Sequence, residues 1–242
     1  MRTCVGILVS NNSKHQVWAP KLPQAMQASA RVVSLAELLS QPEPPRRERL
    51  KLSVRLASSV LQFHTTEWLQ ERWGKQDIYF IQGNSSQSRS LSLETPVVRQ
   101  AFTPEPSVLE ASIESHIIRC NLSLFSLGIV LIELWFWRSV ESFQGNEPPA
   151  YEPQPQCGPG ATSDTARYVT AQGLIDRLYG DAGDEYGDIV RRCITGLDHK
   201  ETKLENDAFK NEVYLKVLQP LEKHLELFFK EPLGKIFEKR GS

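Results

Sequence analysis

The sequence predicts a mainly α-helical domain that carries one small β-hairpin. Three stretches support this prediction: a long apolar run at 121–141, an amphipathic run at 46–64 and a short β-type run at 77–82. The two long runs have the length of helices. The run D-I-Y-F-I-Q at 77–82 is instead closed by the turn-forming residues G-N-S-S-Q-S, and L-S-L at 91–93 is the expected partner strand.

The run 121–141 is the expected centre of the fold. It reads N-L-S-L-F-S-L-G-I-V-L-I-E-L-W-F-W-R-S-V-E, with apolar residues on nearly every helical face. Such a helix is buried on all sides. It is too short to cross a bilayer, and Glu133 in its interior argues further against a membrane span.

The other elements follow in order. We expect a short strand at 5–9, then loop from Ser10 to Ala30, since Pro20 and Pro23 interrupt any long element. The stretch 32–40 predicts a helix with Ser34 as N-cap and Glu37 three residues later. Further helices are expected at 165–179, 185–196 and 205–230, the last kinked or broken at Pro220, and an exposed loop is expected at 145–160.

Composition narrows the class of partner and the compartment. Lys plus Arg total 28 against 29 for Asp plus Glu, so no overall charge favours nucleic acid or an anionic membrane as partner. Four cysteines are scattered without a C-x-x-C pair, which argues against a zinc site and against a disulfide framework. We therefore expect reduced thiols in an intracellular, cytoplasmic protein without cofactor or metal.

The order of these runs resembles the C-terminal lobe of a protein kinase. The quoted matches are S-L-A-E-L-L, R-L-K-L-S-V-R-L-A-S-S-V-L-Q-F-H, D-I-Y-F-I and, most closely, L-F-S-L-G-I-V-L-I-E-L. Together with H-T-T-x-W-L and C-I-T-G-L, the chain resembles a fungal kinase-like family, the domain of unknown function 7580. The resemblance implies a kinase C-lobe-like domain at 31–230 and a C-terminal tail at 231–242. Residues 1–30 are then an N-terminal extension, a remnant of either a missing lobe or an upstream domain.

The resemblance implies kinase activity only if this chain has the catalytic motifs of the kinases, and those motifs are missing. The chain has no G-x-G-x-x-G, no H-R-D and no D-F-G, and fewer than forty residues precede the first lobe-like helix. In the register of the resemblance, Arg72 stands at the base position, Asp77 at the metal-binding asparagine and Ser123 at the aspartate that opens the central helix. A guanidinium cannot accept a proton from a substrate hydroxyl.

These gaps predict a non-catalytic, pseudokinase-type interaction or regulatory module. Its partner would be another protein or another domain of a longer parent chain. The alternative is a divergent phosphotransferase lobe whose nucleotide-binding lobe is supplied elsewhere. A third interpretation is a helical scaffold without kinase ancestry. The kinase comparison fails if 121–141 is not central or if 77–82 is not in a small sheet beside it.

Candidate site residues are few, and each has a structural interpretation beside a functional one. Asp77 is a weak candidate for binding a cation. Its structural interpretation is an aspartate at the start of a strand that is hydrogen-bonded to nearby backbone. Glu133 needs a cation, for which Arg119, Arg138 and Arg192 are candidates. His64 is expected to cap a helix, and the acidic run 181–188 to precede a helix N-terminus. Four tryptophans are expected in the core or in an interaction patch: Trp68, Trp73, Trp135 and Trp137.

Overall fold

The fold was analysed in a computed structural model of the 242-residue chain, which is mainly helical with small antiparallel sheets. The structure describes residues 4–10, 13–18, 31–64, 69, 72–82, 93–98, 121–144, 163–197 and 203–229. Trp68, Arg119, the predicted loop 145–160 and the predicted tail 231–242 lie outside these residues. Two compact units divide the chain, the first containing β1 and β2, the second running from Val33 to Phe80 and from Ser92 onward.

The first unit contains an antiparallel pair, β1 (Cys4–Ser10) and β2 (Ser13–Trp18). The predicted strand at 5–9 is thereby confirmed. The prediction of loop for Ser10–Ala30 is wrong at Ser10 and at 13–18, because S-K-H-Q-V-W pairs with β1 over its whole length, and the rest of that stretch lies outside the described residues. Strand pairing depends on backbone hydrogen bonds, so a polar strand can form beside an apolar one without an apolar run of its own.

A three-stranded sheet has the order β3-β4-β5, with β3 at Arg31–Ser34, β4 at Ile78–Gln82 and β5 at Val97–Val98. The predicted strand at 77–82 is confirmed. Its antiparallel partner among the described residues is Val97–Val98, paired to Tyr79 and Ile78, and of the predicted partner 91–93 only Leu93 is described. Leu93 is a fully buried core residue outside any strand.

The capping prediction at Ser34 is confirmed, although the helix is shorter than expected. The Glu37 backbone N–H donates to Ser34 Oγ at 3.2 Å and starts α2 (Leu35–Leu38). The first three residues of the predicted stretch 32–40 belong to β3. The cap depends on residues three positions apart and could be predicted from the sequence. The strand before it depends on pairing with residues far away in the chain, which the local sequence does not show.

The amphipathic helix is confirmed as α3 (Arg46–Phe63), which buries nine of its residues and begins after Pro45. His64 is its C-cap, with Nδ1 2.9 Å from the Leu61 carbonyl oxygen. Arg49 of α3 is itself buried and donates to the Leu134 and Trp135 carbonyls. A cation at these carbonyls complements the negative C-terminal end of the helix formed by the predicted central run.

That central helix is α5 (Leu122–Phe136), capped by Asn121, whose side chain accepts from the Leu124 N–H at 3.1 Å. Thirteen of its residues are buried, as its all-round apolar sequence predicted. The predicted end at Glu141 is wrong, because Trp137 adopts the left-handed conformation (φ 48°) and terminates the helix. A short 3-10 helix, η1 (Val140–Phe143), follows.

Helices α6 (Ser163–Ala182) and α7 (Asp184–Thr195) confirm the two predicted helices, with α6 starting earlier and ending later than expected. Gly183 (φ 85°) lies between them. Asp184 and Glu185 occupy the first turn of α7, which agrees with the expected acidic helix start. Gly128 of α5 permits close packing on α7, since an added Cβ would lie 2.8 Å from Ile194 Cδ1.

The predicted last helix has three parts: α8 (Asp207–Val213), a π-helical turn η2 (Tyr214–Leu218) and α9 (Gln219–Phe229). Pro220 does not break the helical segment, since α9 continues directly from the π-helical turn η2. Proline has no N–H for the carbonyl four residues earlier, which is that of Lys216. Arg192 Nη1 of α7 donates to this carbonyl oxygen at 3.2 Å and replaces the lost bond.

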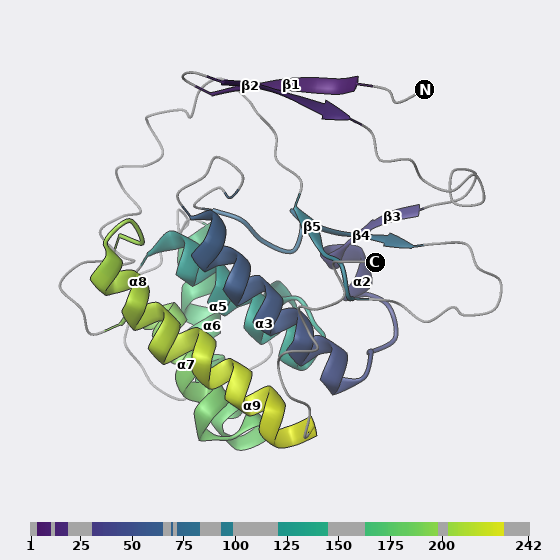
Figure 1. Cartoon of the computed structure of the whole chain (residues 1–242). Helices are drawn as coiled ribbons and strands as arrows, with labels where there is room; N and C mark the ends of the chain where they lie inside the picture. Colours follow the sequence, from purple (N-terminus) through teal and green to yellow (C-terminus); the bar gives the residue numbers. More distant parts are fainter. Residues whose placement is uncertain are drawn as a thin grey trace. The chain divides into compact units, whose positions relative to one another are not determined.

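Within the second unit, α5 occupies the middle and packs against α3, α6 and α7, while α9 packs against α3 and α7. Figure 1 shows α3 and α9 running side by side along this helical layer. In the described part of the chain, no helix has both the length and the apolar character that a bilayer span requires.

Candidate functional site

The loop Arg72–Asp77 leads into β4 and is closed by its own backbone. Gly74 N–H donates to Asp77 Oδ2 at 3.0 Å, and Asp77 N–H donates to the Gly74 carbonyl at 3.0 Å. Trp73 N–H donates to Ser126 Oγ at 3.3 Å and ties the loop to α5. Asp77 is thus placed as the strand-start aspartate that the structural interpretation expected, bonded to neighbouring backbone.

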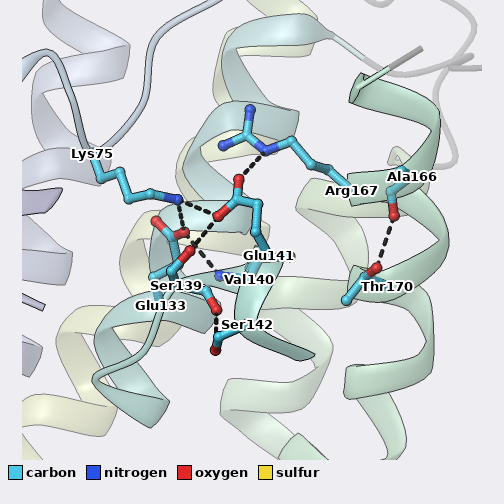
Figure 2. A network of polar contacts seen from close by, with 9 residues as sticks. All are labelled: Lys75, Glu133, Ser139, Val140, Glu141, Ser142, Ala166, Arg167 and Thr170. Atoms are coloured by element: carbon cyan, nitrogen blue, oxygen red, sulfur yellow. Dashed lines mark hydrogen bonds and ion pairs between the residues drawn. The ribbon is translucent and has the colours of Figure 1, made fainter. Parts of the chain in front are cut away.

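Lys75 in this loop is the cation that pairs with Glu133. Its Nζ lies 2.5 Å from Glu133 Oε1 and 2.5 Å from Glu141 Oε2, which joins α5 to η1 through one ammonium group (Figure 2). Val140 N–H also donates to Glu133 Oε1 at 3.0 Å. Arg167 of α6 completes the network, with Nε 3.1 Å from Glu141 Oε1.

Of the arginines considered for Glu133, Arg138 and Arg192 have other contacts, and Arg119 lies outside the described residues. Arg138 is exposed and its guanidinium lies 4.8 Å from the centre of the Phe143 ring. Arg192 bonds to Asp188 and to the Lys216 carbonyl. Lys75 was missed because it is 58 positions away in the sequence. The sequence offers one indication of this pair: Lys75 stands alone between Gly74 and an apolar strand, and a buried glutamate elsewhere in the chain needs a cation.

The two carboxylates of the network have opposite electrostatic environments. Glu133 is 0% exposed, and its burial raises its pKa, against the lowering effect of Lys75. Its Oε2 has no hydrogen-bond partner among the described residues. For Glu141, partial burial raises the pKa, but hydrogen bonds from Lys75 and Ser139 outweigh it and lower the pKa to about 2. The network therefore contains two basic and two acidic side chains, and Lys75 opposes the effect of burial on the pKa of Glu133.

The described tryptophans of the predicted patch are buried. Trp73, Trp135 and Trp137 are 7%, 6% and 4% exposed, so they do not form an exposed surface. The Trp137 indole donates to the Gln41 carbonyl at 2.9 Å, and the Trp135 ring lies between Arg46 and Tyr186. These contacts place the three side chains in the core.

Two hollows lie on the helical unit. The smaller, of about 140 Å³, is enclosed by the loop 72–77, the first half of α5 and Arg167 of α6. The larger, of about 670 Å³, is open and lies between the end of α3 and the α8–η2–α9 segment. Glu222 lines the larger one, and its pKa is raised by burial and by the neighbouring Glu226.

In the described ranges, no three His, Cys, Asp or Glu side chains gather in a way that could hold a metal ion. Asp77 stands apart from the carboxylates of the Lys75 network, each of which is bonded to that ammonium. The arrangement can therefore hold a loop rigidly against a helical core and present two arginines, Arg72 and Arg167, at the smaller cavity.

Fold and site thus define a helical domain whose loop 72–77 is fixed on a central helix by a buried ion-pair network. A sequence model of the family described as "Domain of unknown function (DUF7580)" matches residues 2–228, and the chain belongs to this family. Neither a curated protein nor a solved structure matches it significantly.

Proposed function

We propose that this domain is a non-catalytic, kinase-like interaction or regulatory module of a fungal protein. Its partner is another protein or another domain of a longer parent chain. The observation that carries the proposal is the bonding of the charged side chains in the loop 72–77. Asp77 accepts a hydrogen bond from the loop backbone, and Lys75 is bonded to two carboxyl groups that hold the loop in place. The central position of α5 and the small sheet containing β4 support the kinase-like part of the proposal.

The contacts of this loop argue against proton transfer and nucleotide handling by its own side chains. Arg72 stands where the resemblance puts the base, and a guanidinium has no acceptor atom. Asp77, at the metal-binding position, directs one carboxylate oxygen to the Gly74 N–H. Lys75 is bound by two carboxyl groups at 2.5 Å each, so moving it would leave Glu133 buried without its cation.

The catalytic alternative is tested with the purified full chain. We expect ATP with magnesium to leave the melting temperature unchanged, and phosphate transfer to the chain itself or to generic protein substrates to be absent. Asp77→Asn is the matched variant and should behave as the parent in both assays. ATP-dependent transfer that Asp77→Asn abolishes would replace the proposal with the divergent phosphotransferase.

The interaction role is tested separately, by crosslinking the tagged full-length protein in its native cells and identifying what is joined to it. The proposal requires a partner that, purified on its own, reassociates with the domain in equimolar amount. Failure of every crosslinked protein to reassociate would contradict the interaction role without any bearing on catalysis.

A further inference from the structure

The larger hollow of the helical unit, called here the α3–α9 groove, lies between two helical faces and has a volume of about 670 Å³. One face is the end of α3, where three residues at helical spacing line the groove: Ser58, Leu61 and Gln62. The other face is a single stripe along α8, η2 and α9, with members three or four positions apart: Asp207, Asn211, Tyr214, Leu218 and Glu222. At the helical rise per residue, this stripe is about 22 Å long.

The middle of the groove is apolar. Leu61 and Leu218 line it from its two opposite faces and are nearly buried. Tyr214 lines it as well and keeps 41% of its surface exposed. A tyrosine offers a bound partner a large contact area at a low cost in side-chain entropy, which is why this residue type often anchors interfaces.

Glu222, at one end of the stripe, has no counter-ion among the described residues. Burial raises the pKa of Glu222, and the neighbouring Glu226 raises it further. A basic side chain close by would lower this pKa instead. Lys210 also lines the groove, but about 18 Å of helix separates it from Glu222. A cation brought to this end of the groove would therefore meet an unpaired carboxyl group.

Shape and charge together select the occupant. An open groove of about 22 Å between two helices matches about four turns of an amphipathic helix, which lays its apolar face against apolar walls. Leu61, Tyr214 and Leu218 supply these walls. A lysine or arginine next to the apolar face of such a helix complements Glu222. Nucleic acid is disfavoured, because its phosphates would face Asp207 and Glu222.

We propose that the α3–α9 groove is the docking surface for an amphipathic helix of a partner protein, with a basic residue of that helix paired to Glu222. This inference rests on the proposed function and adds where the partner binds and which chemistry it has. The groove does not include the loop 72–77, so docking leaves the Lys75 network intact.

The test begins with a displayed library of peptides of about 16 residues in a helix-forming frame, randomised on one face and selected on the purified full chain. We expect the selected peptides to carry apolar residues at helical spacing, with lysine or arginine one or two turns away. Selected peptides without a basic residue would overturn the proposal, and so would a selection that yields no binder.

The tightest selected peptide is then titrated against variants of the chain by fluorescence anisotropy. Glu222→Gln should weaken binding about threefold to tenfold, as expected for a partly buried ion pair. Tyr214→Ala should weaken it about tenfold or more, since an interface anchor is lost. Glu205→Gln and Val169→Ala are the matched controls, because both residues are exposed and neither lines the groove. Unchanged affinity in both groove variants, each with a native-like circular dichroism spectrum, would refute the assignment.

A charge exchange separates the ion pair from any effect on folding. Glu222→Lys, and replacement of the basic peptide residue by glutamate, should each weaken binding more than Glu222→Gln does, because like charges then meet. The two changes together should restore most of the lost affinity. Additive losses in the combined experiment would show that Glu222 does not face the basic residue and would overturn the proposed pairing.

Other occupants of the groove have their own signatures. A dimer in sedimentation experiments that Tyr214→Ala dissociates would place a second copy of the chain in the groove. Crosslinks that join the groove to another segment of the same chain would place that segment there. Either result would overturn the partner helix.

Competition connects this test to that of the proposed function. The selected peptide should displace the partner that crosslinking identifies. A partner that reassociates equally well in the presence of the peptide would remove the groove and leave the interaction module standing. ATP-dependent transfer that Asp77→Asn abolishes would instead overturn the non-catalytic function and leave peptide binding at the groove as described.

Discussion

The ammonium group of Lys75 lies 2.5 Å from the carboxylate of Glu133, although the two residues are 58 positions apart. Lys75 belongs to the loop before β4 and Glu133 to the last turn of α5, both within the same compact unit. A buried ion pair of this kind contributes little net stability, yet removing one member leaves an uncompensated charge. The loop and the helix are therefore coupled energetically as well as by contact.

The first prediction concerns this pair. Lys75→Met should lower the free energy of unfolding by about 3 to 5 kcal/mol, because Glu133 is then buried without its cation. Glu133→Gln should cost less, and the double variant should cost clearly less than the sum of the two. Urea unfolding of the four proteins measures the coupling.

The control for that cycle is Lys216→Met, which removes a surface pair to Glu212 at 3.0 Å with both side chains substantially exposed. Its effect should stay within about 1 kcal/mol. Additive losses for Lys75→Met and Glu133→Gln would show that the contact does not couple loop to helix.

A second prediction concerns Pro220 and the carbonyl of Lys216. Arg192→Met should destabilise the parent by about 1.5 to 3 kcal/mol, because a hydrogen bond from a charged donor is lost. In a Pro220→Ala background the same change should cost less, since the alanine N–H can approach that carbonyl. Thermal unfolding of the parent, the two single variants and the double variant measures this difference in cost. The loss of the Arg192–Asp188 contact does not affect the difference, because Arg192→Met removes that contact in both backgrounds.

A third prediction uses two glycines in different surroundings. Gly128→Ala would set a Cβ 2.8 Å from Ile194 Cδ1 and 2.9 Å from Cys193 Cβ, so it should destabilise by about 1 to 3 kcal/mol. Gly173→Ala, exposed on α6 with no heavy atom within 4 Å, should stabilise by about 0.5 to 1 kcal/mol. Equal effects in a melting experiment would mean that α5 and α7 are not in close contact at Gly128.

The fourth prediction concerns pH. Burial lowers the pKa of His224, against the raising effect of Glu185, with Arg46 lowering it further. The unfolded state then takes up a proton near the ordinary value of about 6.5 while the folded state does not, so stability falls as pH drops below about 6.5. The stability stops falling once the pH is below the pKa of His224 in the folded state.

His224→Phe keeps a ring beside Tyr186 and removes this titration. We expect the variant to lose less stability than the parent between about pH 7 and pH 5. His64→Gln, at the end of α3, controls for removal of a histidine elsewhere. Parallel pH profiles for the parent and His224→Phe would contradict the prediction.

The sequence predicted those features that depend on near neighbours. The cap at Ser34, the amphipathic stripe of α3 and the all-round apolar α5 each involve residues a few positions apart. The sequence did not identify the ion-pair partner of Glu133, because Lys75 reaches it only after the loop 72–77 packs against α5. The early end of α5 also escaped prediction, since no glycine marks the left-handed residue; Trp137 adopts that conformation and is buried with its indole bonded to Gln41.

The candidate site was predictable only in part. Asp77 was identified from its place before a strand, and its bond to Gly74 agrees with the local interpretation. Arg167, which faces that loop from α6, shares no motif with it and had no sequence signal. Convergence of side chains from separate elements depends on helix packing, which periodicity describes only as an apolar face.

The π-helical turn at Tyr214–Leu218 determines the angular phase of everything that follows it. A regular α-helix advances about 100° per residue, so shortening this turn by one residue would rotate α9 by about that angle. Leu221, His224 and Leu225, which now face the interior, would then point sideways. Arg192 therefore does more than satisfy a carbonyl: by stabilising the wider turn, it fixes which face of the last helix meets the rest of the helical unit.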